Sequence, residues 1–175
     1  VDAVTQATPL AALKSQGFIE RTSIPVKNLF LGNIQGTIGE TSALAILIGA
    51  VILLAFKIID LKVPLTYIGS FAIFVIFYML GTGKGFDVNY LFSHIFGGGL
   101  MLGAWFMATD YVTSPMSHKG MIIYGVAIGL LTIIIRQWAA YPEGMSFAIL
   151  IMNAFTPLIN MYVKPKRFGE VVKHG

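Results

Sequence analysis

The fold is decided by a run of residues without a single charge, VPLTYIGSFAIFVIFYMLGTG, at positions 63–83. A membrane-spanning helix needs about 20 mostly apolar residues, and this run is long enough. Four further uncharged runs occupy about residues 41–56, 88–109, 120–135 and 144–163. The runs 41–56 and 120–135 are short and would have to borrow flanking residues. The pattern predicts an all-α, polytopic membrane protein with about five transmembrane helices.

The composition supports a membrane protein and limits its chemistry. Of the 175 residues 56% are hydrophobic and 11% are charged, and the mean hydropathy is +0.78. The chain has no cysteine, so it can form neither a disulfide nor an iron–sulfur cluster on its own thiolates. Any redox chemistry in this chain therefore requires an organic cofactor. The net charge of +4 comes from basic residues scattered over the loops, which favours topology signals over a nucleic-acid surface.

The uncharged runs divide the chain into three parts. Residues 1–37 are polar enough to lie outside the bilayer, residues 38–163 form the predicted five-helix bundle, and residues 164–175 form a basic tail. Five crossings place the first and last parts on opposite sides of the membrane. Lys164, Lys166 and Arg167 follow the last run directly. The positive-inside rule therefore predicts that the tail is cytoplasmic and that residues 1–37 are external. The sequence does not begin with Met, and we expect it to be the C-terminal part of a longer chain.

The stretch DAVTQAT at residues 2–8 is followed by Pro9 and then by good helix formers. Proline suits the first helical position, so Thr8 is predicted to be a helix N-cap. A helix N-terminus offers free N–H groups and the positive end of the dipole, which favour a phosphate. The alternative is an ordinary cap on a surface helix.

Asp2, Thr5, Ala7 and Thr8 match the pattern D-x-x-[S/T]-x-A-T. This stretch resembles the flavinylation motif of membrane flavoproteins of the Rnf complex and of the Na⁺-translocating NADH:quinone reductase. The sequence departs from the usual form where glycine is common, because it has Ala3 and Gln6 there. The resemblance implies that a flavin transferase esterifies Thr8 to the phosphate of FMN.

Three further stretches, residues 36–49, 96–115 and 141–153, are similar to the D subunit of the Rnf complex, a ferredoxin:NAD⁺ oxidoreductase that translocates Na⁺ or H⁺. The resemblance implies an electron relay in a prokaryotic cell (inner) membrane that works with the A, E and G membrane subunits and the B and C peripheral subunits. It also implies a second, non-covalent flavin, riboflavin. Family members have about ten helices in two halves of opposite orientation, related in architecture to urea channels, and this chain corresponds to the second half.

Three acids stand at the ends of uncharged runs, where ionisable groups often mark ion paths. Glu40 and Glu143 begin a weak internal repeat, since each is followed five residues later by the sequence AILI. Asp110 closes the third run, where a negative charge opposes the helix dipole. We interpret all three as candidates for an ion path or a flavin contact. The alternatives are helix-start carboxylates for the first two and a surface pair with Lys119 for Asp110.

Two other features have structural interpretations. The spacing of Gly99 and Gly103 favours close helix packing over the approach of a flat ring. Arg136, together with Trp138 and Tyr141, is typical of an interfacial belt. His94 has no second ligand at metal spacing, and no metal site is predicted.

Two other functions compete with the Rnf interpretation. One is the B subunit of the Na⁺-translocating NADH:quinone reductase, which would reduce quinone. The other is a flavin-free channel or transporter, which the urea-channel architecture alone would allow.

Overall fold

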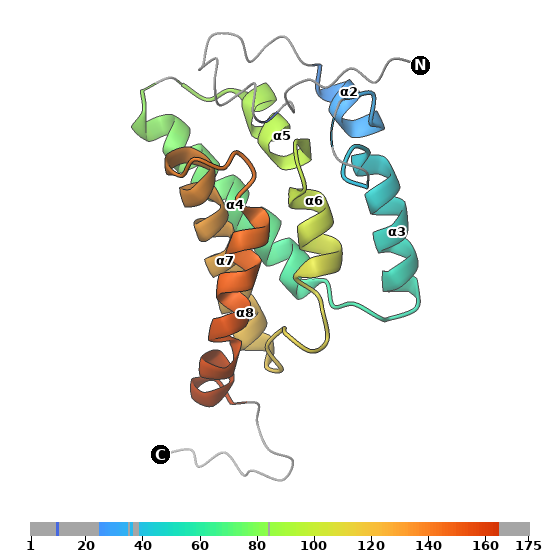
Figure 1. The fold of residues 1–175 in the computed structure, drawn as a ribbon, viewed down its shortest axis with the longest axis vertical. Helices are drawn as coiled ribbons and strands as arrows, with labels where there is room; N and C mark the ends of the chain where they lie inside the picture. Colours follow the sequence, from blue (N-terminus) through green and yellow to red (C-terminus); the bar gives the residue numbers. More distant parts are fainter. Residues whose placement is uncertain (1–9, 11–24, 35, 37–38, 84, 165–175) are drawn as a thin grey trace.

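All elements in the described part of the chain are helical, which confirms the all-α prediction (Figure 1). The structure, a computed structural model, describes residues 10, 25–34, 36, 39–83 and 85–164. Its helices are α2 (Val26–Leu31), α3 (Ala43–Ala55), α4 (Lys62–Gly81), α5 (Val88–Phe96), α6 (Leu100–Leu102), the π-helical turn η2 (Gly103–Met107), α7 (His118–Trp138) and α8 (Met145–Tyr162).

Each of the five uncharged runs forms a helix, but the helices differ in length. Helices α4, α7 and α8 are long and apolar enough to cross a membrane. The pair formed by α5 and the segment Leu100–Met107 is bent by 61° and would be a fourth span if both parts cross together. Helix α3 has 13 residues, which corresponds to about 20 Å against a hydrocarbon core of about 30 Å. The structure is that of a polytopic membrane protein with three helices long enough to span a membrane and two shorter or broken apolar segments.

The helices alternate in direction, as the sequence predicts. Figure 1 shows α3, α6 and α8 running downward and α4 and α7 running upward. We call the end that holds the α4–α5 and α7–α8 connections the upper end. The lower end holds the α3–α4 and η2–α7 connections. Which end faces the cytoplasm stays a prediction.

The tightest packing in the bundle joins α4 and α7, which lie parallel to each other. A Cβ atom at Gly125 would lie 2.1 Å from Oγ1 of Thr66, and one at Gly129 would lie 2.1 Å from Oγ of Ser70. The two glycines therefore let the helix backbones approach, which is how membrane helices gain van der Waals contact. Parallel neighbours require the chain to return between them, and α5, α6 and η2 make that return.

The returning segment is broken at the glycines 97–99. Gly98 has φ +69°, a left-handed conformation that a side chain would strain. Because the helix stops here, backbone carbonyls at the end of α5 have no partner within their own helix. Helix geometry resumes at Leu100 and passes into the π-helical turn.

Candidate functional site

Three stretches that lie far apart in the sequence meet at the upper end of the bundle. A Cβ atom at Gly99 would lie 2.9 Å from Oε2 of Glu40 and 3.9 Å from Oε2 of Glu143. The missing side chain of Gly99 thus leaves room for both carboxylates. Each of the three residues comes from a different one of the three stretches that resemble the Rnf protein.

The two glutamates are positioned by the helix starts that follow them. Ser42 caps α3, because its hydroxyl oxygen accepts a hydrogen bond from the Ala45 N–H at 3.3 Å. Gly144 caps α8 with φ +63°, and a Cβ atom there would lie 2.6 Å from Cγ2 of Ile135. Glu40 and Glu143 therefore stand just before the amino ends of two helices, where a negative charge is stabilised by the helix dipole.

Arg136 lies beside the same glycine break and is only 3% exposed. Its Nε donates to the carbonyl of Glu143 at 2.9 Å, and its Nη2 donates to the carbonyl of Gly97 at 3.4 Å. Its Nη1 donates to the carbonyl of His94, and the guanidinium lies 5.1 Å from the centre of the Phe71 ring. Arg136 thus ties the broken end of α5 to the α7–α8 connection.

The interfacial-belt interpretation is wrong for Arg136. Trp138 and Tyr141 are 71% and 62% exposed, as a belt requires, but Arg136 points inward. The physical reason is the break in the returning helix, which leaves carbonyl groups that a buried guanidinium can satisfy. The sequence does contain a signal for this burial. It is an arginine at the end of an uncharged run, in a chain that also has a glycine triplet.

The two carboxyl groups lie near each other in the space beside Gly99. Glu40 is 9% exposed and Glu143 is half-buried. Burial raises the pKa of Glu143 above its ordinary value, the neighbouring Glu40 raises it further, and the positive charge of Arg136 opposes both. Two carboxyl groups face one guanidinium, so the cluster can accept a proton or a cation.

Leu10 lies at the same place. Its side chain is 2% exposed, and its Cδ2 lies 3.3 Å from where a Cβ atom at Gly98 would be. The Nη2 of Arg136 lies 3.6 Å from the same position. Asp2, Thr5, Ala7 and Thr8 lie outside the described residues, so the predicted cap and flavin attachment stay predictions. Leu10 is nevertheless the second residue after Thr8 in the chain.

The structure separates Asp110 from the other two acids. Asp110 is exposed at the lower end, and its Oδ2 accepts a hydrogen bond from Oγ1 of Thr113 at 3.1 Å. Asp110 precedes α7 and Glu143 follows it, and the 21 residues of that helix span about 30 Å. No ion pair joins Asp110 to Lys119 in the described part of the chain. The carboxylate instead supports the turn that leads into α7.

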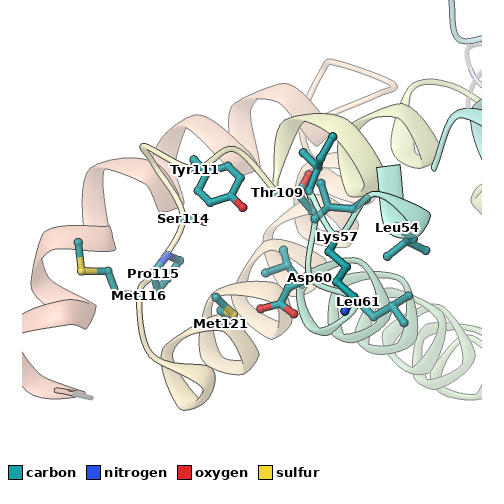
Figure 2. A pocket seen from close by; sticks show the side chains of 13 residues that line it. Leu54, Lys57, Asp60, Leu61, Thr109, Tyr111, Ser114, Pro115, Met116 and Met121 are labelled. Atoms are coloured by element: carbon teal, nitrogen blue, oxygen red, sulfur yellow. The ribbon is translucent and has the colours of Figure 1, made fainter. Parts of the chain in front are cut away.

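The lower end contains a pocket of about 690 Å³ between the α3–α4 connection and the η2–α7 connection. Figure 2 shows its lining, in which Lys57, Asp60 and Tyr111 come from these two connections. Lys57 has φ 55°, a left-handed conformation that is uncommon for a residue with a side chain. None of the three candidate acids lines this pocket.

The remaining interpretations concern packing at the site. The side chain of Met145 fills the space beside Gly103, since a Cβ atom there would lie 2.3 Å from its Sδ. The spacing of Gly99 and Gly103 therefore serves helix packing, as predicted. His94 is buried, and its ring meets the ring of Tyr90 edge-on at 4.3 Å. In the described part of the chain, no three His, Asp or Glu side chains group as metal ligands.

These features define a class, the polytopic helical membrane proteins, with a broken helix and a buried charge cluster at one end. Comparison with known proteins then places the chain more closely. Residues 1–169 match the model of the NQR2, RnfD, RnfE family, and the chain belongs to that family.

The curated relatives carry consistent names. The D subunit of the Na⁺-translocating ferredoxin:NAD⁺ oxidoreductase complex of Acetobacterium woodii is 46% identical over 171 residues, covering 96% of this chain and 50% of the relative. The D subunit of the proton-translocating ferredoxin:NAD⁺ oxidoreductase complex of Clostridium ljungdahlii is 42% identical over 175 residues, covering 97% of this chain and 52% of the relative. The chain spans about half the length of the curated relatives it matches.

Proposed function

We propose that this chain is part of a membrane flavoprotein in an Rnf-type complex, with FMN attached to Thr8. In this proposal it relays electrons between ferredoxin and NAD and couples their transfer to movement of Na⁺ or H⁺. It works with the other Rnf subunits in a prokaryotic cell membrane and does not catalyse the reaction alone. The family match and the names of the relatives support this assignment.

The observation that carries the flavin assignment is the burial of Leu10 against the glycine break. Leu10 packs beside Arg136, and Thr8 precedes Leu10 by two residues, a length of chain that spans at most about 7 Å. The Thr8 hydroxyl would hold the phosphate of FMN, and the buried guanidinium would supply a positive charge in the same region. FMN, when attached, supplies the electron transfer that this cysteine-free chain cannot perform itself. We also propose riboflavin as a second, non-covalent cofactor, without assigning its contacts.

Charge balance links electron transfer to ion movement in this proposal. Negative charge added near the upper end favours uptake of a cation or proton by nearby carboxylates, because attraction is strong where water is scarce. Glu40 and Glu143 lie together at that end and would be the first groups to take up the cation or proton. Asp110 would serve the path at the opposite end.

The attachment is tested by expressing the full-length chain with its flavin transferase and comparing Thr8→Ala with Thr22→Ala. Thr22 is a threonine of the same N-terminal segment outside the motif, which makes it a matched control. Flavin fluorescence in a denaturing gel should be lost only in the first variant, and mass spectrometry should find the FMN mass on the peptide that contains Thr8. Unmodified peptide from the wild-type chain would refute the attachment.

The coupling is tested in the assembled complex by alanine variants of Glu40, Asp110 and Glu143, alone and together. We expect the triple variant to lower the number of ions moved per electron transferred, measured in vesicles with a flavin-loaded complex. A triple variant that keeps the wild-type ratio would rule out these acids as the coupling groups.

The B subunit of the quinone reductase is a second candidate function, because the family model covers both kinds of protein. The two candidates differ in the electron donor and in the electron acceptor. Purified complex that reduces quinone with NADH as donor, and does not reduce NAD with reduced ferredoxin as donor, would favour the quinone reductase. A chain without flavin fluorescence that conducts a solute through vesicles would instead indicate a channel or transporter.

A further inference from the structure

The pocket at the lower end combines charged, hydroxylic and apolar side chains. It encloses about 690 Å³ where α3 ends and the membrane-length helices α4 and α7 begin, which is the level of a membrane–water boundary. Figure 2 shows Lys57 and Asp60 on one side of the pocket and Tyr111 and Ser114 on the other. A pocket of this size and composition suits a small amphipathic molecule.

Lys57 occupies a backbone position that normally belongs to glycine. Its N–H donates to the carbonyl of Leu54 at 2.9 Å, and the N–H of Ile58 donates to the carbonyl of Leu53 at 2.9 Å. These two bonds form the Schellman motif that ends α3, and the residue at its left-handed position, here with φ 55°, is usually glycine. Strained backbone positions cluster at functional sites. The structure therefore keeps a lysine in the pocket wall where glycine would fit the backbone better.

The polar groups of the pocket are available to a ligand. Among the residues that the structure describes, Lys57 and Asp60 take part in no ion pair. The side-chain hydroxyls of Tyr111 and Ser114 make no hydrogen bond within the same residues. The pocket thus offers a cation, an anion and two hydroxyl donors. A ligand that carries both a phosphate and a hydrogen-bonding cation would use all of them.

The rim of the pocket is apolar although it lies at the surface. The exposed large side chains of the two connections that form it are Phe56, Ile58, Leu61, Tyr111, Val112 and Met116. Val112 is 87% exposed, and Met116, which also lines the pocket, is 80% exposed. Exposed apolar surface gathered in one place marks contact with a membrane or with another protein. At the ends of membrane-length helices, such a rim suits acyl chains.

We propose that this pocket binds the head group of an aminophospholipid, a lipid that carries a phosphate and a primary ammonium group. Lys57 pairs with the phosphate, whose other oxygens accept hydrogen bonds from Tyr111 and Ser114. Asp60 accepts from the ammonium group, and the acyl chains lie along the apolar rim. The inference rests on the described residues and does not depend on FMN.

Charge complementarity separates this ligand from others of similar size. An anionic phospholipid without an amine would satisfy Lys57 but would set its own charge beside Asp60. A neutral molecule such as riboflavin or a quinone would displace water and leave both charges without a partner, which is unfavourable. The quaternary ammonium of phosphatidylcholine has no N–H to donate to Asp60. Phosphatidylethanolamine is therefore expected to bind more tightly than phosphatidylcholine, and phosphatidylglycerol more weakly than either.

Variants of the two charged residues test the individual contacts. Asp60→Asn removes the charge that attracts the ammonium, so the preference for phosphatidylethanolamine over phosphatidylglycerol should disappear. Lys57→Gln removes the partner of the phosphate and should weaken both lipids about fivefold. Lys57→Gly has the same effect and fits the left-handed conformation, so it serves if the glutamine variant fails to assemble. Lys119→Gln removes an exposed cation that does not line the pocket and is the matched control.

Binding is measured by photolabelling of the full-length chain in its complex, in detergent. The probe is a short-chain phosphatidylethanolamine with a photoreactive group in an acyl chain, and mass spectrometry quantifies the label on peptides that contain residues 54–63 and 109–121. Unlabelled phosphatidylethanolamine should compete about fivefold better than phosphatidylglycerol in the wild type and in Lys119→Gln. The two lipids should compete equally in Asp60→Asn, and both Lys57 variants should need about fivefold more probe for the same label.

Three results would overturn the proposal. The first is label that appears elsewhere in the complex and is absent from these peptides, since another subunit or another ligand would then fill the pocket. The second is equal competition by the two lipids in the wild type, or a preference that survives in Asp60→Asn. The third is competition by glycerophosphoethanolamine at the concentrations at which the lipid competes, which would indicate a site for a soluble phosphate ester.

Discussion

Replacing Arg136 by methionine should destabilise the protein more than any change at an exposed cation. Methionine keeps much of the side-chain volume and removes the donors. The two shorter hydrogen bonds, to the carbonyls of Glu143 and His94, are charge-assisted, and such bonds contribute about 1.5–3 kcal/mol each. The contact with Gly97 at 3.4 Å is long and adds less.

The expected loss in the free energy of unfolding is about 4 kcal/mol, because two buried carbonyl groups lose charge-assisted hydrogen bonds. For a chain of this size, 1 kcal/mol corresponds to about 2–4 °C in Tm, so the melting temperature should fall by roughly 10 °C. The melting temperature of the Arg136→Lys variant should lie between those of the wild type and Arg136→Met, because lysine keeps the charge but not the planar set of donors.

The assay is thermal unfolding of the purified protein in detergent, followed by tryptophan fluorescence. Lys119→Gln is the control, since Lys119 is an exposed cation at the opposite end of the same helix, and it should change Tm by less than about 2 °C. An Arg136→Met variant that melts within about 2 °C of the wild type would refute the view that Arg136 holds the broken helix in place.

Three further predictions follow from the packing and the charges. Gly129→Ala should cost about 1–3 kcal/mol, because its methyl group would meet Ser70 at 2.1 Å, whereas Gly69→Ala, with nothing within 4 Å, should be neutral; both are measured by denaturant unfolding. A double-mutant cycle of Tyr67→Phe and Thr132→Val should give a coupling free energy of about 0.5–1.5 kcal/mol from their 3.0 Å hydrogen bond, and strict additivity would contradict it. The raised pKa of Glu143 means that the native state holds this proton more tightly than the unfolded chain, so the stability it contributes is fully present below the ordinary carboxyl pKa and is lost as pH rises through the raised value. Melting temperatures across this pH range should show that decline in the wild type and a smaller one in Glu143→Gln.

The sequence by itself determined the class of fold and the direction of the helices. Uncharged runs such as residues 63–83 have no stable alternative to a membrane helix, because backbone groups in lipid must be satisfied within their own segment. Short connections between the runs force neighbouring helices to alternate in direction. The acids Glu40 and Glu143 were also recognised from the sequence, since each stands alone at the edge of an uncharged run.

The tertiary structure decided which of these residues act together. No local signal places Glu40 near Glu143, because 103 positions separate them (143 − 40) and the two carboxyl groups come together only where both approach Gly99. Burial of Arg136 likewise depends on carbonyls that become available only where α5 ends. Periodicity and composition report what each segment prefers, whereas a charge cluster is fixed by packing between segments, and only the folded chain specifies that packing.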